Sequence, residues 1–173
     1  MYKESVYNLI QRNGRVKRFH TSTTLGSETI AEHSWGVAML CIALTDNRCS
    51  VRLLSKALFH DLPEQETGDL PAPVKWEHPI LRTALGAIED VFELKHETYT
   101  VLNEEEQFIF KVADMLHLLT TVHHEYMLGN MTMNELWENG NDYLEDLDNS
   151  TEEGIPQLAK DIIKQMYEER GAV

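Results

Sequence analysis

Apolar side chains recur every three or four positions along most of the chain, the spacing that places them on one face of an α-helix. The pattern is most regular over residues 104–128, along one stripe formed by Phe108, Val112, Met115, Leu119 and Val122. No stretch sustains the alternation of apolar and polar residues that marks a half-buried strand. The pattern therefore predicts an all-α fold.

Local sequence signals divide the chain into further helices. Residues 29–32 (Thr-Ile-Ala-Glu) fit a capping box, so a helix should begin there and run to about residue 46. A second helix is expected over residues 51–62 and should end at Pro63. Other helices are expected over residues 1–12, 78–97, 131–147 and 155–169. Two prolines predict an ordered loop over residues 68–73.

Composition narrows the class of protein. Since no repeat or linker interrupts the pattern, residues 1–173 are expected to form a single domain. The formal net charge is -14, from 29 acidic and 15 basic residues. An acidic surface argues against broad binding to nucleic acid or anionic membrane, which needs basic residues. An acidic surface is still compatible with a small phosphorylated substrate. A bound metal ion and a few Lys or Arg side chains can make the electrostatic potential positive at the binding site.

The cysteines and the hydropathy indicate a location. Cys41 and Cys49 form no CxxC pattern, and they fit ordinary thiols in a reducing compartment. The first residues contain no apolar signal-peptide core, and no run of 18 apolar residues occurs. We therefore expect a soluble, cytoplasmic protein with no membrane partner.

A histidine–aspartate pair stands at the end of the second predicted helix. Alone, His60 and Asp61 would more often be a helix-terminal histidine beside a solvated carboxylate. However, His33 lies in the first turn of the capped helix, and Asp114 lies inside the longest helix. Two imidazoles and two carboxylates from three helices suit a divalent ion such as Zn, Co, Mn or Fe. The alternative for Asp114 is an ion pair with Lys111 on a solvated face.

The order H…HD…D formed by these four residues resembles the HD-domain phosphohydrolase superfamily. Longer blocks are similar to the bacterial 5′-deoxynucleotidase family related to YfbR, and they cover residues 17–19, 32–34, 60–64 and 67–75. The resemblance spans roughly residues 15–128. The resemblance implies a helical bundle around a divalent metal ion, with a second ion as an open possibility. It also implies self-association as a dimer or hexamer. The helix after residue 130 is a candidate interface.

Short blocks at residues 16–21 and 60–66 are most similar to phage dATP triphosphohydrolases. This resemblance implies that metal-activated water attacks the α-phosphorus of dATP, with dADP and dAMP left open as substrates. Such an activity depletes dATP in phages that use 2-aminoadenine. The nearest alternative is a 5′-deoxynucleotidase acting on monophosphates. A non-catalytic metal-binding helical module and a guanosine-tetraphosphate hydrolase are more distant alternatives.

The resemblance also implies roles around the metal. Glu64 and Asp69 would orient the attacking water, protonate the leaving oxygen or help to hold a second ion, and the sequence does not apportion these roles. Phosphate, base and sugar contacts are expected from Arg18, Lys75, Lys111, Phe19, Pro73 and Thr21. The other histidines, His117 among them, fall outside the ligand set. The second histidine pair of a dinuclear phosphodiesterase is not evident, which disfavours cyclic-nucleotide hydrolysis.

Overall fold

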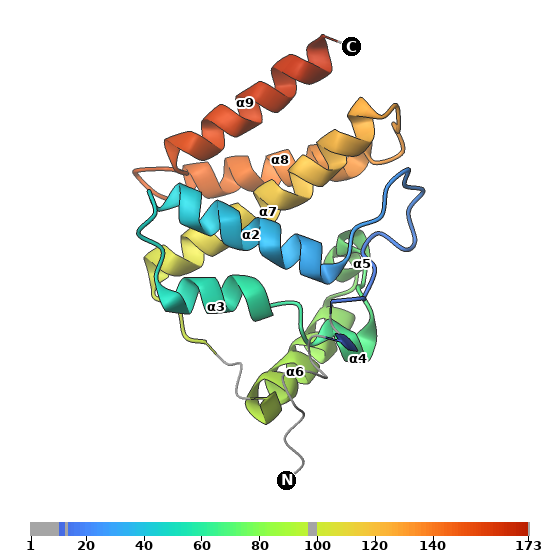
Figure 1. Cartoon of the computed structure of the whole chain (residues 1–173), viewed down its shortest axis with the longest axis vertical. Coiled ribbons are helices and arrows are strands. Elements are labelled where there is room, and N and C mark those ends of the chain that lie inside the picture. Colours follow the sequence, from blue (N-terminus) through green and yellow to red (C-terminus); the bar gives the residue numbers. More distant parts are fainter. Residues whose placement is uncertain (1–10, 13, 97–99, 173) are drawn as a thin grey trace.

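The computed structural model describes residues 11–12, 14–96 and 100–172, and its architecture is helical (Figure 1). In these ranges the named elements are all helices, joined by loops and by one isolated antiparallel bridge between Lys17 and Thr29. The predicted all-α fold is confirmed. The helix expected over residues 1–12 falls almost entirely outside the described residues.

The helices follow one another along the chain as α2 (Ile30–Leu44), α3 (Val51–Phe59), α4 (Glu64–Thr67), α5 (Ala72–Glu77), α6 (Pro79–His96), α7 (Glu104–Met127), α8 (Asn134–Asn149) and α9 (Gln157–Gly171). Most bounds lie within three residues of those expected. The loop predicted over residues 68–73 is correct only as far as Pro71, because α5 begins at Ala72. A proline in the first helical turn is tolerated, since the amide that it lacks has no partner within the helix.

Capping boxes fix where the two site-bearing helices begin. At α2 the Thr29 amide donates to Glu32 Oε2 (2.7 Å), and the Glu32 amide donates to Thr29 Oγ1 (3.3 Å). At α7 Asn103 and Glu106 form the same reciprocal pair. Each box satisfies amides that would otherwise lack partners at a helix start. The predicted start of α2 is confirmed.

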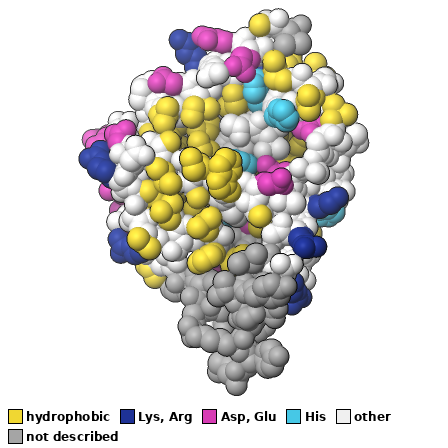
Figure 2. Space-filling view, viewed as in Figure 1, with side chains coloured by type: hydrophobic (Ala, Val, Ile, Leu, Met, Phe, Trp, Pro, Cys, Tyr) yellow, Lys and Arg dark blue, Asp and Glu magenta, His cyan; other side chains and the backbone are white. Residues whose placement is uncertain are grey.

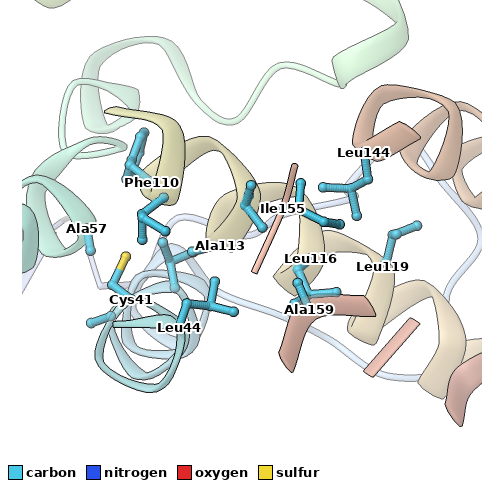
Figure 3. Close-up of a cluster of buried hydrophobic side chains, with 14 of the residues drawn as sticks. Cys41, Leu44, Ala57, Phe110, Ala113, Leu116, Leu119, Leu144, Ile155 and Ala159 are labelled. Atoms are coloured by element: carbon cyan, nitrogen blue, oxygen red, sulfur yellow. The ribbon is translucent and has the colours of Figure 1, made fainter. Parts of the chain in front are cut away.

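Helix α7 lies at the centre of the fold and packs against α2, α3, α8 and α9. Along its predicted stripe Val112, Leu119 and Val122 are buried, whereas Phe108 and Met115 are half-buried. Figure 3 shows side chains from α2, α3, α7, α8 and α9 meeting in this core, among them Cys41, Ala57, Ala113, Leu116, Leu144 and Ala159. Burying each large aliphatic side chain contributes about 1.5–3 kcal/mol. The result is a rigid frame for the polar residues of α2 and α7.

Two expectations about the chemical environment can be compared with the structure. Cys41 and Cys49 are free thiols, and burial raises the pKa of Cys41 to about 12, so it behaves as an ordinary apolar core residue. Among the described helices, none is long and apolar enough to cross a bilayer.

Candidate metal centre

Three helices bring the four expected metal ligands together. His33 lies in the first turn of α2, His60 caps α3, Asp61 follows it, and Asp114 lies in the middle of α7. His33 Nε2 is 3.0 Å from Asp114 Oδ1 and 3.6 Å from Asp61 Oδ2. His60 Nε2 is 3.2 Å from Asp61 Oδ1 and 3.3 Å from His33 Nε2. Two imidazole nitrogens and two carboxylates thus converge on one point.

Each histidine is oriented through its second ring nitrogen. His60 Nδ1 lies 3.0 Å from the Ala57 carbonyl, to which it can only donate, so Nε2 is the nitrogen left for a cation. His33 is completely buried, and its Nδ1 lies 3.0 Å from Nδ1 of His117. Burial and the nearby charges of His33 and Arg18 lower the pKa of His117 to about 4, so its ring is neutral at neutral pH.

The electrostatics of the cluster favour a cation. Burial lowers the pKa of His60, but Asp61 and Asp114 outweigh this effect and raise it to about 9. Burial would also raise the pKa of Asp61, yet the neighbouring His60, His33 and Arg18 hold it below its usual range. Both shifts arise because carboxylates surround the imidazole nitrogens. A divalent ion bound at this point would supply the positive charge that the carboxylates favour, in place of the proton on the imidazole. The set of donor atoms therefore fits a metal ion.

Glu64 begins α4, three residues after Asp61, and it is buried. Lys75 Nζ donates to its Oε1 at 3.0 Å, whereas its Oε2 is buried with no hydrogen-bond partner among the described residues. Burial, followed by the charges of Asp61 and Asp69, raises the pKa of Glu64 to about 8, although Lys75 opposes the shift. A carboxyl group whose pKa is raised in this way can act as an acid near neutral pH.

Arg18 is held beside the cluster by the start of α2. The Arg18 amide donates to the Glu28 carbonyl, and the Ile30 amide donates to the Val16 carbonyl, each at 2.9 Å. The Arg18 guanidinium lies between two carboxylates, with Nε 2.9 Å from Glu28 Oε2 and Nη1 3.1 Å from Asp61 Oδ2. It thus stabilises the ionised form of Asp61 and retains further N–H groups for a ligand.

A cavity of about 670 Å³ opens onto the two aspartates of this cluster, whereas His33 and His60 are not among its lining residues. The expected site residues that line it are Arg18, Phe19, Thr21, Asp61, Glu64, Asp69, Lys75 and Asp114. Lys111 is exposed and lies outside the lining, and no ion pair between Lys111 and Asp114 is found in the described part of the chain. Pro73 lies in the first turn of α5, and its side chain is not among those that the structure describes. Leu70, Pro71 and Val74 form the wall around that position instead.

Several lining residues had no sequence-based assignment. Met115 and Leu118 follow Asp114 on α7, so their positions on the same helical turn could have indicated them. Thr132 lies in the turn before α8 and Glu135 in the first turn of α8, and no local pattern connects them with the ligands. His117 lies three residues after Asp114, which is also a spacing that shares a helical face.

An all-helical frame that brings two histidines and two aspartates together beside one cavity fits a metal-dependent phosphohydrolase of the HD type. The model of one family, described as 5′-deoxynucleotidase YfbR-like, matches residues 5–165. The chain belongs to this family, and it is a metal-dependent nucleotide hydrolase.

Similar proteins agree with this assignment. A 5′-deoxynucleotidase from Photorhabdus laumondii is 29% identical over 142 residues, which cover 69% of this chain and 72% of the relative. A 5′-deoxynucleotidase from Yersinia pestis is 29% identical over 138 residues, covering 66% and 70%. Among solved structures, the cyanophage S-2L HD phosphohydrolase DatZ, bound to dA and one catalytic Zn²⁺ ion, has a TM-score of 0.67 and 22% identity, with 100% of both chains covered. An HD-domain phosphohydrolase from Listeria innocua has a TM-score of 0.74 and 19% identity, covering 96% and 88%. These two structures support the fold.

Proposed function

We propose that this chain hydrolyses the bond between the 5′-oxygen and the α-phosphorus of 2′-deoxynucleotides, with dATP as its preferred substrate. The products are deoxyadenosine and triphosphate. The observation that carries the proposal is one cavity lined by both aspartates of the four-residue cluster, by Glu64 with its raised pKa and by the cationic Arg18. In a phage that uses 2-aminoadenine, this reaction would deplete dATP.

The proposed metal ligands are His33, His60, Asp61 and Asp114. A divalent ion of the Zn, Co, Mn or Fe class polarises a phosphate oxygen and lowers the pKa of water near it. The two imidazoles leave their Nε2 atoms directed at the cluster, because each Nδ1 faces another partner. The chain thereby presents four ligand atoms without rearranging either ring.

The protein residues have separate tasks in the proposed reaction. The remaining guanidinium N–H groups of Arg18 bind phosphate oxygens. Hydrolysis joins the water oxygen to phosphorus and breaks the bond to the 5′-oxygen, which leaves as a hydroxyl group. Glu64 supplies the proton for that oxygen from its unpartnered side and regains a proton from solvent. Lys75 holds the other Glu64 oxygen, and Asp69 helps to keep Glu64 protonated.

The nucleoside would occupy the wall of the cavity formed by residues 19–22. Phe19 and Thr21 line this part of the cavity; we assign the Phe19 ring to the base and the exclusion of a ribose 2′-hydroxyl to Thr21. The adenine preference draws on DatZ, whose solved structure holds dA. Lys111 takes no part in this assignment because it is exposed and outside the lining.

A 5′-deoxynucleotidase acting on monophosphates is the second candidate, favoured by the description of the family and of its relatives. Incubation of the metal-loaded protein with dATP, dAMP or ATP, followed by separation of the products, distinguishes the two. Deoxyadenosine and intact triphosphate from dATP support the proposal, and turnover of dAMP alone supports the rival. Equal turnover of ATP and dATP would contradict the preference for deoxyribose. His60→Ala is the inactive control.

The same proposal treats residues 1–173 as one cytoplasmic, self-associating domain. The face that α2 and α3 present in Figure 2 shows gathered apolar side chains, and the exposed ones on these helices include Trp35, Met39, Leu58 and Phe59. The helix after residue 130 is the weaker candidate interface, because α8 directs Trp137 into the core. Light scattering should report a dimer or larger assembly, and a monomer at micromolar concentration would contradict self-association.

A further inference from the structure

His117 packs directly against His33, a proposed metal ligand. Its Nδ1 lies 3.0 Å from Nδ1 of His33, and the two rings meet edge to face, with centroids 4.9 Å apart and planes at 72°. His33 itself is completely buried. No other described hydrogen bond reaches His33 Nδ1, so His117 is the partner of that nitrogen.

The direction of this hydrogen bond follows from the chemistry of imidazole. A histidine that binds a metal through Nε2 is neutral and carries its proton on Nδ1. His33 Nδ1 must then donate, and Nδ1 of His117 must accept. His117 is therefore required as the tautomer that carries its proton on Nε2. The other tautomer would set two N–H groups against each other.

The fold makes room for His117 in this position. A Cβ atom at Gly36, one turn after His33 on α2, would overlap the His117 ring. A glycine at this position lets the Nε2–Cδ2 edge of the His117 imidazole approach α2 beside His33. The packing that positions His117 is thus built into both helices.

Glu28 does not compete for the Nδ1 atom of His117. Its Oε1 is 3.8 Å away, which is too long for a hydrogen bond. The carboxylate is already engaged by the Arg18 guanidinium at 2.9 Å and by the Thr121 hydroxyl at 2.7 Å. Glu28, His33 and His117 lie close enough to be considered as ligands of a second ion. A second ion at this place would require His33 to lose its Nδ1 proton and to bridge two metals beside the positive charge of Arg18. The hydrogen bond between His33 and His117 is therefore favoured over a second metal site.

We propose that His117 is a positioning residue, which accepts a hydrogen bond from the Nδ1–H of His33 and so holds His33 in the tautomer and orientation that bind metal. The inference rests on the proposed metal centre. Outer hydrogen-bond partners of metal-bound histidines typically contribute about 10- to 100-fold to metal affinity. His117 should contribute within this range.

The direct test is a long-range ¹H–¹⁵N NMR spectrum of the full chain, labelled at histidine and loaded with zinc. We expect a protonated Nδ1 on His33 and a bare Nδ1 with a protonated Nε2 on His117. The spectrum of His117→Phe assigns the resonances. A protonated Nδ1 on His117, or a bare Nδ1 on His33, would overturn the inference.

Zinc affinity, measured by competition with a chromophoric chelator, provides the second readout. His117→Phe keeps an aromatic ring at this position but loses the acceptor, so zinc binding should weaken about 10- to 100-fold. His117→Gln restores an acceptor oxygen and should recover part of the loss, while the exposed His124→Phe on the same helix should match wild type. Wild-type affinity in His117→Phe would refute the role of His117 alone. Failure of the wild-type chain to bind zinc would instead refute the metal centre.

Discussion

The carboxylate of Asp69 accepts a hydrogen bond from the backbone amide of Phe19 at 3.1 Å, across fifty positions of the chain. Phe19 has a φ of 56°, in the left-handed region that is costly for a bulky side chain. Such a conformation persists when surrounding contacts hold it. Asp69 therefore holds the turn that places Arg18 and Phe19 at the cavity, in addition to lining the cavity itself.

Two substitutions of Asp69 should separate its contact from its charge. Asp69→Ala removes the acceptor for the Phe19 amide, and it should lower the free energy of unfolding by about 1.5 kcal/mol. Asp69→Asn keeps an acceptor oxygen and should unfold close to wild type. Urea unfolding of the three proteins measures the difference. Equal stability of the alanine and asparagine variants would show that the contact does not hold the turn.

Glu64 should act as an acid with a distinctive pH profile. Because its pKa is raised to about 8, kcat/KM should fall as the pH rises through about 8 and Glu64 loses its proton. Glu64→Gln should lower kcat by about 10²- to 10⁴-fold and abolish this decline. The exposed Glu66→Gln, from the same turn, is the matched control. A profile that keeps its decline near pH 8 in Glu64→Gln would assign the titration to another group.

Neighbouring charges should move the Glu64 titration in opposite directions. Lys75 lowers the pKa of Glu64, so Lys75→Met should shift the decline in kcat/KM to higher pH. Asp69 raises that pKa, so Asp69→Asn should shift the decline to lower pH. The exposed Lys164→Met serves as the control for loss of a positive charge. Shifts of the same sign in both variants would contradict this electrostatic account.

The metal-free protein should lose stability at alkaline pH because of His60. Its pKa is about 9 in the folded protein, against an ordinary value of 6.5. A raised folded pKa contributes stability that is complete below pH 6.5 and is lost as the pH rises through 9. The free energy of unfolding in chelator should thus fall by up to about 3 kcal/mol between pH 6 and pH 9.5. If His60→Asn shows the same slope as wild type, another group is responsible.

The frame of the site could be predicted from sequence because its signals are local. Hydrophobic spacing indicated α7, and the residues of the capping box indicated the start of α2, three positions before His33. The H…HD…D order then named four residues that the structure does bring together, with the histidine Nε2 atoms 3.0–3.7 Å from carboxylate oxygens of the two aspartates. Helix starts and helical faces are determined by neighbours in the chain, so these features are readable one segment at a time.

The other features of the site depend on how distant segments of the chain pack together, so the sequence of one segment does not predict them. Lys111 shares a predicted stripe with Asp114, yet the helix packing leaves it exposed and outside the cavity. The contact between Asp69 and Phe19 joins two loops, and the place of His117 depends on the glycine at position 36 of another helix. The limits of a proline-rich loop were also too wide, because proline is compatible with the first turn of α5.

We propose that His33, His60, Asp61 and Asp114 hold a catalytic divalent ion. Anomalous diffraction from zinc-loaded crystals of the full chain would locate this ion. We predict a peak about 2.0–2.2 Å from Nε2 of both histidines and from an oxygen of each aspartate. No peak at this point with saturating zinc, or a peak between Glu28, His33 and His117 in its place, would contradict the account.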